Sequence, residues 1–144
     1  MDLEEIVQRL AQDVPNAIGA IVCDYEGETV TLALGRAPLP AEAEDHARSY
    51  IPRAMVPDVD LGEFLLKLAG AEPCALIRLF DKHSKSHGTG PLTSLDLRYR
   101  GVDMLVRRLP EDYYVLLVLL RPALAARARV RLEAASRALA ALVG

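Results

Sequence analysis

The histidines of this sequence come closest to the spacing of a metal site. His83 and His87 lie four positions apart, as paired zinc ligands do on one face of a helix. The residues between them are serine, lysine and serine, so the glutamate of an HExxH metalloprotease pattern is missing. The third histidine lies far away in the sequence and supplies no further ligand. The polar, glycine-containing segment 81–91 therefore reads as a loop with two solvated histidines, and we predict no metal site.

The two cysteines and a group of acids are the other candidates for catalysis. Cys23 and Cys74 each lie in an apolar segment, and a buried thiol has a raised pKa and little reactivity. Glu42, Glu44 and Asp45 crowd into a polar segment between prolines, which is typical of a solvated face. The chain also lacks the GxxxxGK[ST] and GxGxxG motifs that bind phosphates. We therefore predict no enzymatic activity and no cofactor.

Length and composition predict a single globular domain over residues 1–144. Of the 144 residues, 51% are hydrophobic and 26% are charged. The net charge of −3 and the small set of aromatic residues, 5 Tyr and 2 Phe without Trp, disfavour nucleic-acid binding. No apolar run reaches the roughly 18 residues of a membrane-spanning helix, and the acidic first residues are unlike a secretory signal. We expect a cytoplasmic protein that binds neither nucleic acid nor membrane.

Charge is divided unevenly along the chain. Residues 1–72 hold 14 acids and 5 bases, a net charge of −9. Residues 73–144 hold 6 acids and 12 bases, a net charge of +6. Such polarity can steer contact with a partner, or it can leave two solvated faces that neutralise each other in the fold.

The N-terminal part of the sequence predicts a helix followed by a β-hairpin. Apolar residues recur at helical spacing over residues 2–14, and Asp2 is placed to cap this helix. Residues 17–25 are apolar almost throughout, as in a strand covered on both faces. Residues 29–35 alternate in polarity, and Gly27 supplies the turn between the strands. The alternation places three apolar side chains on one face: Val30, Leu32 and Leu34.

The middle of the sequence is less regular. Residues 36–60 hold four prolines and read as an insert or extended connection, with a helix at about positions 40–51. A helix over residues 61–69 is expected to end at Gly70. Residues 73–80 fit either a helix or a short strand, and helix is favoured. The apolar stripe of these helical segments comprises Leu61, Phe64, Leu65, Leu68, Leu76, Ile77 and Phe80.

The C-terminal part predicts three strands and a helix. Segments 94–99 and 102–107 alternate in polarity around a turn, and the unbroken apolar segment 113–120 is typical of a central strand. A last helix follows, opened by Pro122. The order α-β-β-α-β-β-β-α predicts an α+β sandwich, in which helices cover both faces of a five-stranded, mostly antiparallel sheet.

Tyr25 is an aromatic residue among the acids of the hairpin turn Asp24-Tyr25-Glu26-Gly27-Glu28. An exposed tyrosine at this turn would suit the binding of a partner protein. Alternatively, its side chain folds back onto the sheet. The sequence leaves both alternatives open.

The element order and several local strings resemble the roadblock family of small dimeric domains related to dynein light chains. The resemblance covers most of the chain, from the end of the first helix at Val14-Pro15-Asn16-Ala17 through the hairpin GAIVCDYEGETV. It is strongest at LRYRGVDMLVRRLPEDYYVLLVLLRP, residues 97–122. The sequence departs from the family at the long insert 36–60. It also departs at Gly70 to Pro73, which interrupt a helix that is usually continuous.

The resemblance implies a roadblock/longin-like fold and a non-catalytic homodimer. In the family, the middle helices of two subunits pack together and sheet edges pair across the two-fold axis. Coverage of an open sheet edge also protects against aggregation. Transferred to this sequence, the expected interface residues are Phe64, Leu65, Leu68, Leu76, Phe80, Leu95, Leu97 and Tyr99.

The resemblance also implies partners. Bacterial members act with Ras-like small GTPases, as activators or adaptors in cell polarity and gliding motility. One branch binds a sister roadblock protein through an exposed aromatic-acidic motif before the hairpin glycine, and Tyr25, Glu26 and Glu28 are the corresponding candidates here. We therefore expect an adaptor or regulator of this kind. The alternative is a small-molecule-sensing α+β domain with a ligand cavity between the sheet and the middle helix.

Overall fold

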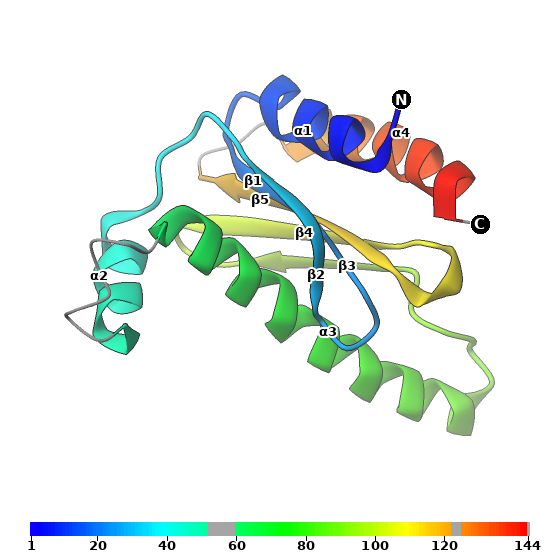
Figure 1. The fold of residues 1–144 in the computed structure, drawn as a ribbon. Helices are drawn as coiled ribbons and strands as arrows, with labels where there is room; N and C mark the ends of the chain where they lie inside the picture. The colour runs from blue at the N-terminus through cyan, green and yellow to red at the C-terminus, as the bar shows by residue number, and fades with distance from the viewer. Residues whose placement is uncertain (52–59, 122–124, 144) are drawn as a thin grey trace.

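A computed structural model gives the fold of residues 1–51, 60–121 and 125–143 (Figure 1). The order α-β-β-α-β-β-β-α predicted from the sequence is confirmed, with α2 and α3 together in the place of the middle helix. The elements are α1 (Leu3–Asp13), β1 (Ala17–Cys23), β2 (Thr29–Leu34), α2 (Ala41–Tyr50), α3 (Leu61–His87), β3 (Ser94–Arg98), β4 (Val102–Arg108), the 3-10 turn η2 (Pro110–Asp112), β5 (Tyr114–Leu120) and α4 (Ala125–Val143).

The five strands form one antiparallel sheet in the order β2-β1-β5-β4-β3. The apolar strand β5 lies at the centre, as predicted, and every residue of β1 is buried. Each of these two strands is covered on both faces, which explains why neither shows a polar alternation. The edges of the sheet are β2 and β3, and they are the strands with the most exposed residues.

Helices α1 and α4 pack side by side on one face of the sheet, whereas α3 crosses the other face (Figure 1). The core under α1 and α4 includes Val7, Leu10, Leu132 and Leu139. Asp2 caps α1 as predicted, since its carboxylate accepts a hydrogen bond from the N–H of Glu5 at 2.8 Å. The predicted start of the last helix at Pro122 lies outside the described residues. Within the described ranges, no helix is both long and apolar enough to cross a bilayer.

Helix α3 is one continuous element of 27 residues. The predicted helix end at Gly70 is therefore wrong, and so is the predicted interruption between Gly70 and Pro73. A Cβ atom at Gly70 would lie 2.6 Å from the Sγ atom of Cys23 on β1, so this buried glycine permits close packing of the helix on the sheet. The helical alternative favoured for residues 73–80 is confirmed.

The helix ends at Gly88 instead. This residue has a left-handed φ of 68°, and its N–H donates a hydrogen bond to the carbonyl of Ser84. The loop predicted over residues 81–91 is therefore wrong for its first seven residues, 81–87, which continue the helix. His83 and His87 lie on this last part of α3, and both are exposed.

The apolar residues of α3 divide between two faces. Its inner face packs on the sheet through residues that include Leu66, Cys74 and Ile77. Four large apolar residues of the helix remain between 38% and 50% exposed: Leu68, Leu76, Leu79 and Phe80. The predicted apolar stripe therefore mixed two faces, because a helix with apolar residues in two directions cannot be oriented from their spacing alone.

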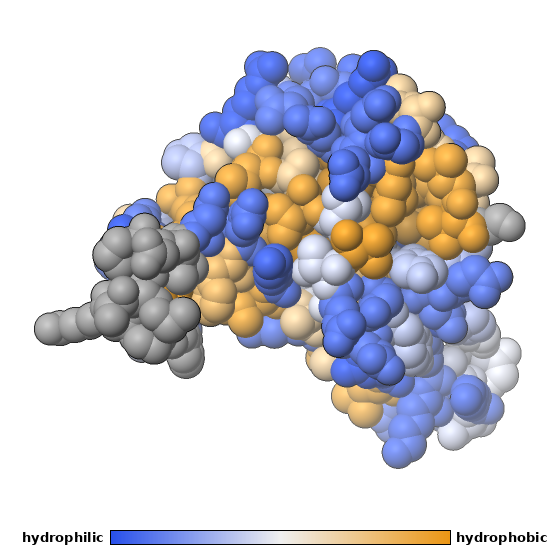
Figure 2. All heavy atoms as spheres, viewed as in Figure 1, coloured by the Kyte–Doolittle hydropathy of each residue, from blue (hydrophilic) through white to orange (hydrophobic). Residues whose placement is uncertain are grey.

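The β1–β2 hairpin contains a β-bulge that changes the predicted alternation of β2. The pairing register shifts between Val22 and Cys23, which leaves Val30 as the extra residue. Leu32 and Leu34 pack toward α3, whereas Val30 lies on the other side, near the ends of α1 and α4. The prediction that these three side chains share one face is wrong for Val30. Figure 2 shows apolar surface along this edge, between the hydrophilic surfaces of α1 and α3.

We expect Gly19→Ala to lower the free energy of unfolding by about 1–3 kcal/mol, because an added Cβ atom overpacks the contact between β1 and α3. The Cβ atom would collide with the side chain of Leu66 on α3 and would lie 2.8 Å from the carbonyl oxygen of Ala33 on β2. Gly101→Ala is the matched control, since a Cβ atom there meets nothing within 4 Å. Urea unfolding measures both variants, and equal stabilities would contradict this account of the packing.

Candidate partner-binding surface

The turn of the β1–β2 hairpin carries the predicted partner-binding residues. The carboxylate of Asp24 accepts hydrogen bonds from the N–H groups of Glu26, at 3.0 Å, and Glu28, at 2.9 Å. Gly27 has a φ of 88°, and a Cβ atom there would lie 3.0 Å from the Cα of Ala71 on α3. The turn is thus fixed against α3, and the side chains of Glu26 and Glu28 are exposed to solvent.

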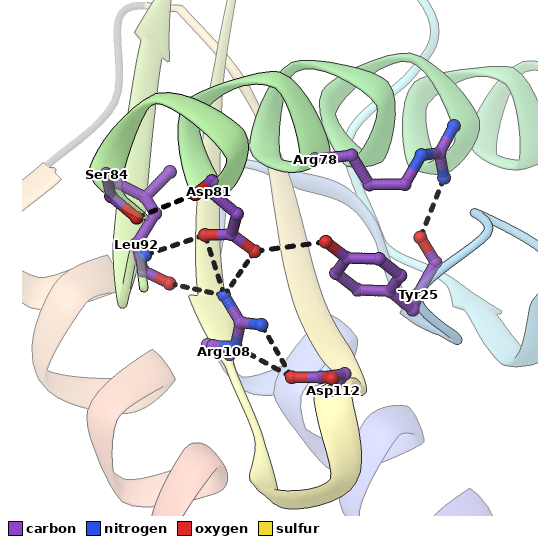
Figure 3. Close-up of polar contacts among 7 residues, drawn as sticks. All are labelled: Tyr25, Arg78, Asp81, Ser84, Leu92, Arg108 and Asp112. Carbon is purple, nitrogen blue, oxygen red and sulfur yellow. Dashed lines mark hydrogen bonds and ion pairs between the residues drawn. The ribbon is translucent and has the colours of Figure 1, made fainter. Parts of the chain in front are cut away.

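Tyr25 folds back toward the sheet, so the structure selects one of the two alternatives that the sequence left open (Figure 3). Its hydroxyl donates a hydrogen bond to Oδ2 of Asp81 at 3.2 Å, and its ring stacks on Tyr114 with centroids 6.2 Å apart. Nη1 of Arg78 donates to the Tyr25 carbonyl at 2.7 Å. The tyrosine is half-buried, and it joins the hairpin turn to the C-terminal half of α3.

Arg108 and Asp81 form the centre of a polar network below this turn (Figure 3). Nη1 of Arg108 lies 2.9 Å from Oδ2 of Asp81 and also donates to the carbonyl of Leu92 at 3.1 Å. The same guanidinium donates to Asp112 through Nε and Nη2, at 3.1 and 2.5 Å. The N–H of Leu92 completes the network with a 2.9 Å bond to Asp81. One arginine therefore connects β4, η2, α3 and the segment before β3.

The network changes the protonation equilibria of its members. Burial alone would raise the pKa of the Asp81 carboxyl, but the hydrogen bonds from Leu92 and Arg108 hold that pKa below its usual value. Burial and the adjacent Asp81 carboxylate raise the pKa of the Tyr25 hydroxyl. Burial raises the pKa of Tyr114 as well. Asp81 is therefore ionised and both tyrosines are neutral at physiological pH, which suits a fixed structural network.

The residues predicted for a dimer interface lie on the outer face of α3 and on the edge strand β3. Leu68, Leu76 and Phe80 are exposed on α3, and Tyr99, which follows β3, is 49% exposed. Leu79 is exposed among the α3 residues but is absent from the predicted set. The half-buried members of the set are Phe64, Leu65, Leu95 and Leu97.

Sequence reasoning missed the residues that hold Tyr25 in place. Asp81 and Arg108 are 27 positions apart, and Tyr25 and Asp81 are 56 positions apart. No local spacing signals such a contact. The continuation of helical spacing past Phe80 would have placed Asp81 on the inner face of α3, since it follows Ile77 by four positions.

The candidates for metal or thiol chemistry remain apart from this network. Within the described ranges, no group of three His, Cys, Asp or Glu side chains is arranged to hold a metal ion. Cys23 and Cys74 are buried in the same apolar cluster. The neighbouring Cys74 thiol and burial together raise the pKa of the Cys23 thiol, which keeps it protonated.

Comparison with known proteins shows which fold this arrangement defines. No family model matches the sequence, and no curated protein matches it. Among solved structures, a Roadblock/LC7 domain from Streptomyces avermitilis is 15% identical with a TM-score of 0.64, over 96% of this chain and 95% of that chain. The gliding protein MglB from Thermus thermophilus is 16% identical with a TM-score of 0.69, over 94% and 84%. A structure described as MglB with tetrameric arrangement is 15% identical with a TM-score of 0.69, over 94% and 83%.

The chain therefore has the roadblock fold, as the resemblance of the sequence implied. MglB structures are among its neighbours in fold.

We expect Asp81→Asn to lower the free energy of unfolding at neutral pH by about 1–3 kcal/mol, since Arg108 loses a charged partner. The folded-state pKa of Asp81 lies below its usual value, so this contribution is present at higher pH and is lost as pH falls through the folded-state pKa. The difference in the free energy of unfolding between wild type and variant should be constant near neutral pH and should shrink below about pH 4.

Urea titrations over this pH range test the network. Asp112→Asn is the control, because the Asp112 side chain is 55% exposed and its effect should be smaller. A difference between wild type and Asp81→Asn that widened toward low pH would contradict the assigned direction of the pKa.

Proposed function

We propose that this chain is a non-catalytic, homodimeric regulator of the roadblock family. In this proposal it binds a sister roadblock protein, a Ras-like small GTPase, or both, in the control of bacterial polarity or gliding motility. It acts in the cytoplasm without nucleic acid or membrane as a partner. The observation that carries the proposal is the apolar outer face of α3 on a roadblock fold.

The outer face of α3 supports a dimer because it is apolar and uncovered. Leu68, Leu76, Leu79 and Phe80 recur at intervals that keep them on one side of the helix, away from the sheet. Exposed apolar patches on one helix favour association with another protein. A two-fold axis would place the same residues of a second copy opposite them, so the patch would be covered by itself.

The edge strand β3 supports the same dimer. Among the described residues it pairs with β4 on one side only, so its outer edge has backbone N–H and C=O groups with no strand partner there. Pairing with the β3 strand of a second copy would satisfy these groups and extend the sheet across the axis. Leu95, Leu97 and Tyr99 would then lie close to the dimer axis.

The partners are proposed from the fold neighbours and from the hairpin turn. The solved neighbours include MglB, described as a gliding protein in one case and as a tetrameric arrangement in another. Glu26 and Glu28 are exposed on a turn that Asp24 and Gly27 fix in place. A fixed acidic turn is suited to a basic partner surface, and Tyr25 lies half-buried beside it.

The alternative function, a small-molecule sensor, gains no support from the packing of α3 on the sheet. The expected ligand cavity between them would be bordered by residues such as Ile77, Val106 and Tyr114. These side chains pack so closely that the space between them admits no water molecule.

The dimer is tested with the double variant Leu76→Asp/Phe80→Asp. Two aspartates on the proposed interface would be desolvated in the dimer, so the variant should sediment as a monomer at micromolar concentration whereas wild type sediments as a dimer. Leu142→Asp is the matched control, since Leu142 is 51% exposed on α4, and it should leave the dimer intact. A monomeric wild type would refute the dimer.

The regulatory role is tested by GTP turnover. A pulldown from native cytoplasm identifies the Ras-like GTPase or sister roadblock protein, and GTP hydrolysis is then measured with and without the chain. We expect Glu26→Lys/Glu28→Lys and Tyr25→Ala to weaken partner binding about tenfold or more, the first through lost charge complementarity and the second because the acidic turn loses the side chain that holds it in place. Glu42→Lys, an exposed acid on α2, is the control. The role would be rejected if the chain bound no GTPase and left the rate of GTP hydrolysis unchanged with every GTPase tested.

A further inference from the structure

A groove lies between the C-terminal half of α3, the loop that follows it and the end of β4. Its volume is about 590 Å³, and the half-buried ring of Tyr25 borders it. The charged residues that line it are Arg78, Lys82, Lys85 and Arg108, with Asp81 and Asp112. Four positive charges face two negative ones, although the whole chain has a net charge of −3. The groove is therefore a local basic site on an acidic protein.

The two acids of the groove share one arginine. Both Asp81 and Asp112 form ion pairs with Arg108, at 2.9 and 2.5 Å. In the part of the chain that the structure describes, neither Lys82 nor Lys85 lies within salt-bridge distance of an acid. The six charged groups of the groove sum to a net charge of +2, and its cations without an ion pair among the described residues are the two lysines and Arg78.

The spacing of these cations matches an extended chain. Arg78, Lys82 and Lys85 are separated by four and three positions, so they follow one side of α3. At a rise of about 1.5 Å per residue they span about 10 Å of the helix. An extended peptide covers the same distance in about four residues and presents side chains to one side at every second position. Two or three carboxylates on such a segment can therefore reach the three cations.

We propose that this groove binds an extended acidic segment of a partner protein, whose carboxylates contact Lys82, Lys85 and Arg78. A nucleic acid fits less well, because the one aromatic ring at the groove, that of Tyr25, is already stacked on Tyr114 and offers no platform for bases. A flat bilayer cannot follow the recess between α3 and the loop. The groove uses neither the outer face of α3 nor β3, so the proposal is independent of the dimer and of a GTPase partner.

The test measures the fluorescence anisotropy of a labelled oligoglutamate peptide titrated with the full-length protein. We expect saturable binding that weakens with added salt and that Lys82→Glu/Lys85→Glu reduces by about tenfold or more. Lys67→Glu is the control, because Lys67 is an exposed lysine on the same helix outside the groove, and it should change binding by less than about twofold.

Three results would overturn the proposal. One is no binding of oligoglutamate to wild type at low salt. Another is an equal loss of peptide affinity in Lys67→Glu and in the groove variant, which would indicate general charge attraction. The third is tighter binding of an oligothymidylate or of phosphatidylserine vesicles at the same lysines, which would assign the groove to phosphates. Unchanged thermal unfolding of Lys82→Gln/Lys85→Gln, together with reduced peptide binding, confirms that the variants act on the groove and not on folding.

Discussion

The close approach of α3 to strand β1 is the constraint on which the rest of the structure depends. It is possible because glycines occupy the contact on both sides, Gly19 on the strand and Gly70 on the helix. With the helix at this depth, its inner face packs on the sheet through residues that include Leu66, Cys74 and Ile77. The other large apolar residues of the helix lie outside this contact and remain exposed on its outer face. The packing that stabilises the monomer thereby creates the surface proposed for the dimer.

The same placement of α3 fixes the electrostatics of its C-terminal half. Asp81 points to the sheet and lies over the end of β4, where Arg108 binds both it and Asp112. Because Arg108 engages both of these acids, neither acid lies within salt-bridge distance of the cations on the neighbouring part of the helix. The hydroxyl of Tyr25 donates a hydrogen bond to Asp81 of this network. The same network therefore positions the hairpin turn and contributes to the charge of the groove.

The described molecule therefore offers three surfaces of different chemistry on and around a single helix. The outer face of α3 is apolar, the hairpin turn beside it is acidic, and the groove at its C-terminal half is basic. Apolar faces suit permanent association, whereas exposed charges affect the rate and specificity of encounter more than its strength. The proposed dimer would use the apolar face, and the proposed contacts with other partners would use the charged turn and the groove.

The sequence by itself determined the element order, the hairpins, the central strand and the cap of α1, because periodicity and turn residues act within a few positions. It also placed the candidate residues Tyr25, Glu26 and Glu28 on one turn. It misplaced the end of the middle helix at Gly70, since a glycine needed for packing and a glycine that ends a helix look alike in sequence. Only the tertiary structure decided which face of α3 is buried, that Tyr25 folds inward and that Arg108 meets Asp81. Those outcomes depend on contacts between residues 27 to 56 positions apart. Such contacts form only after the sheet has brought the distant segments together.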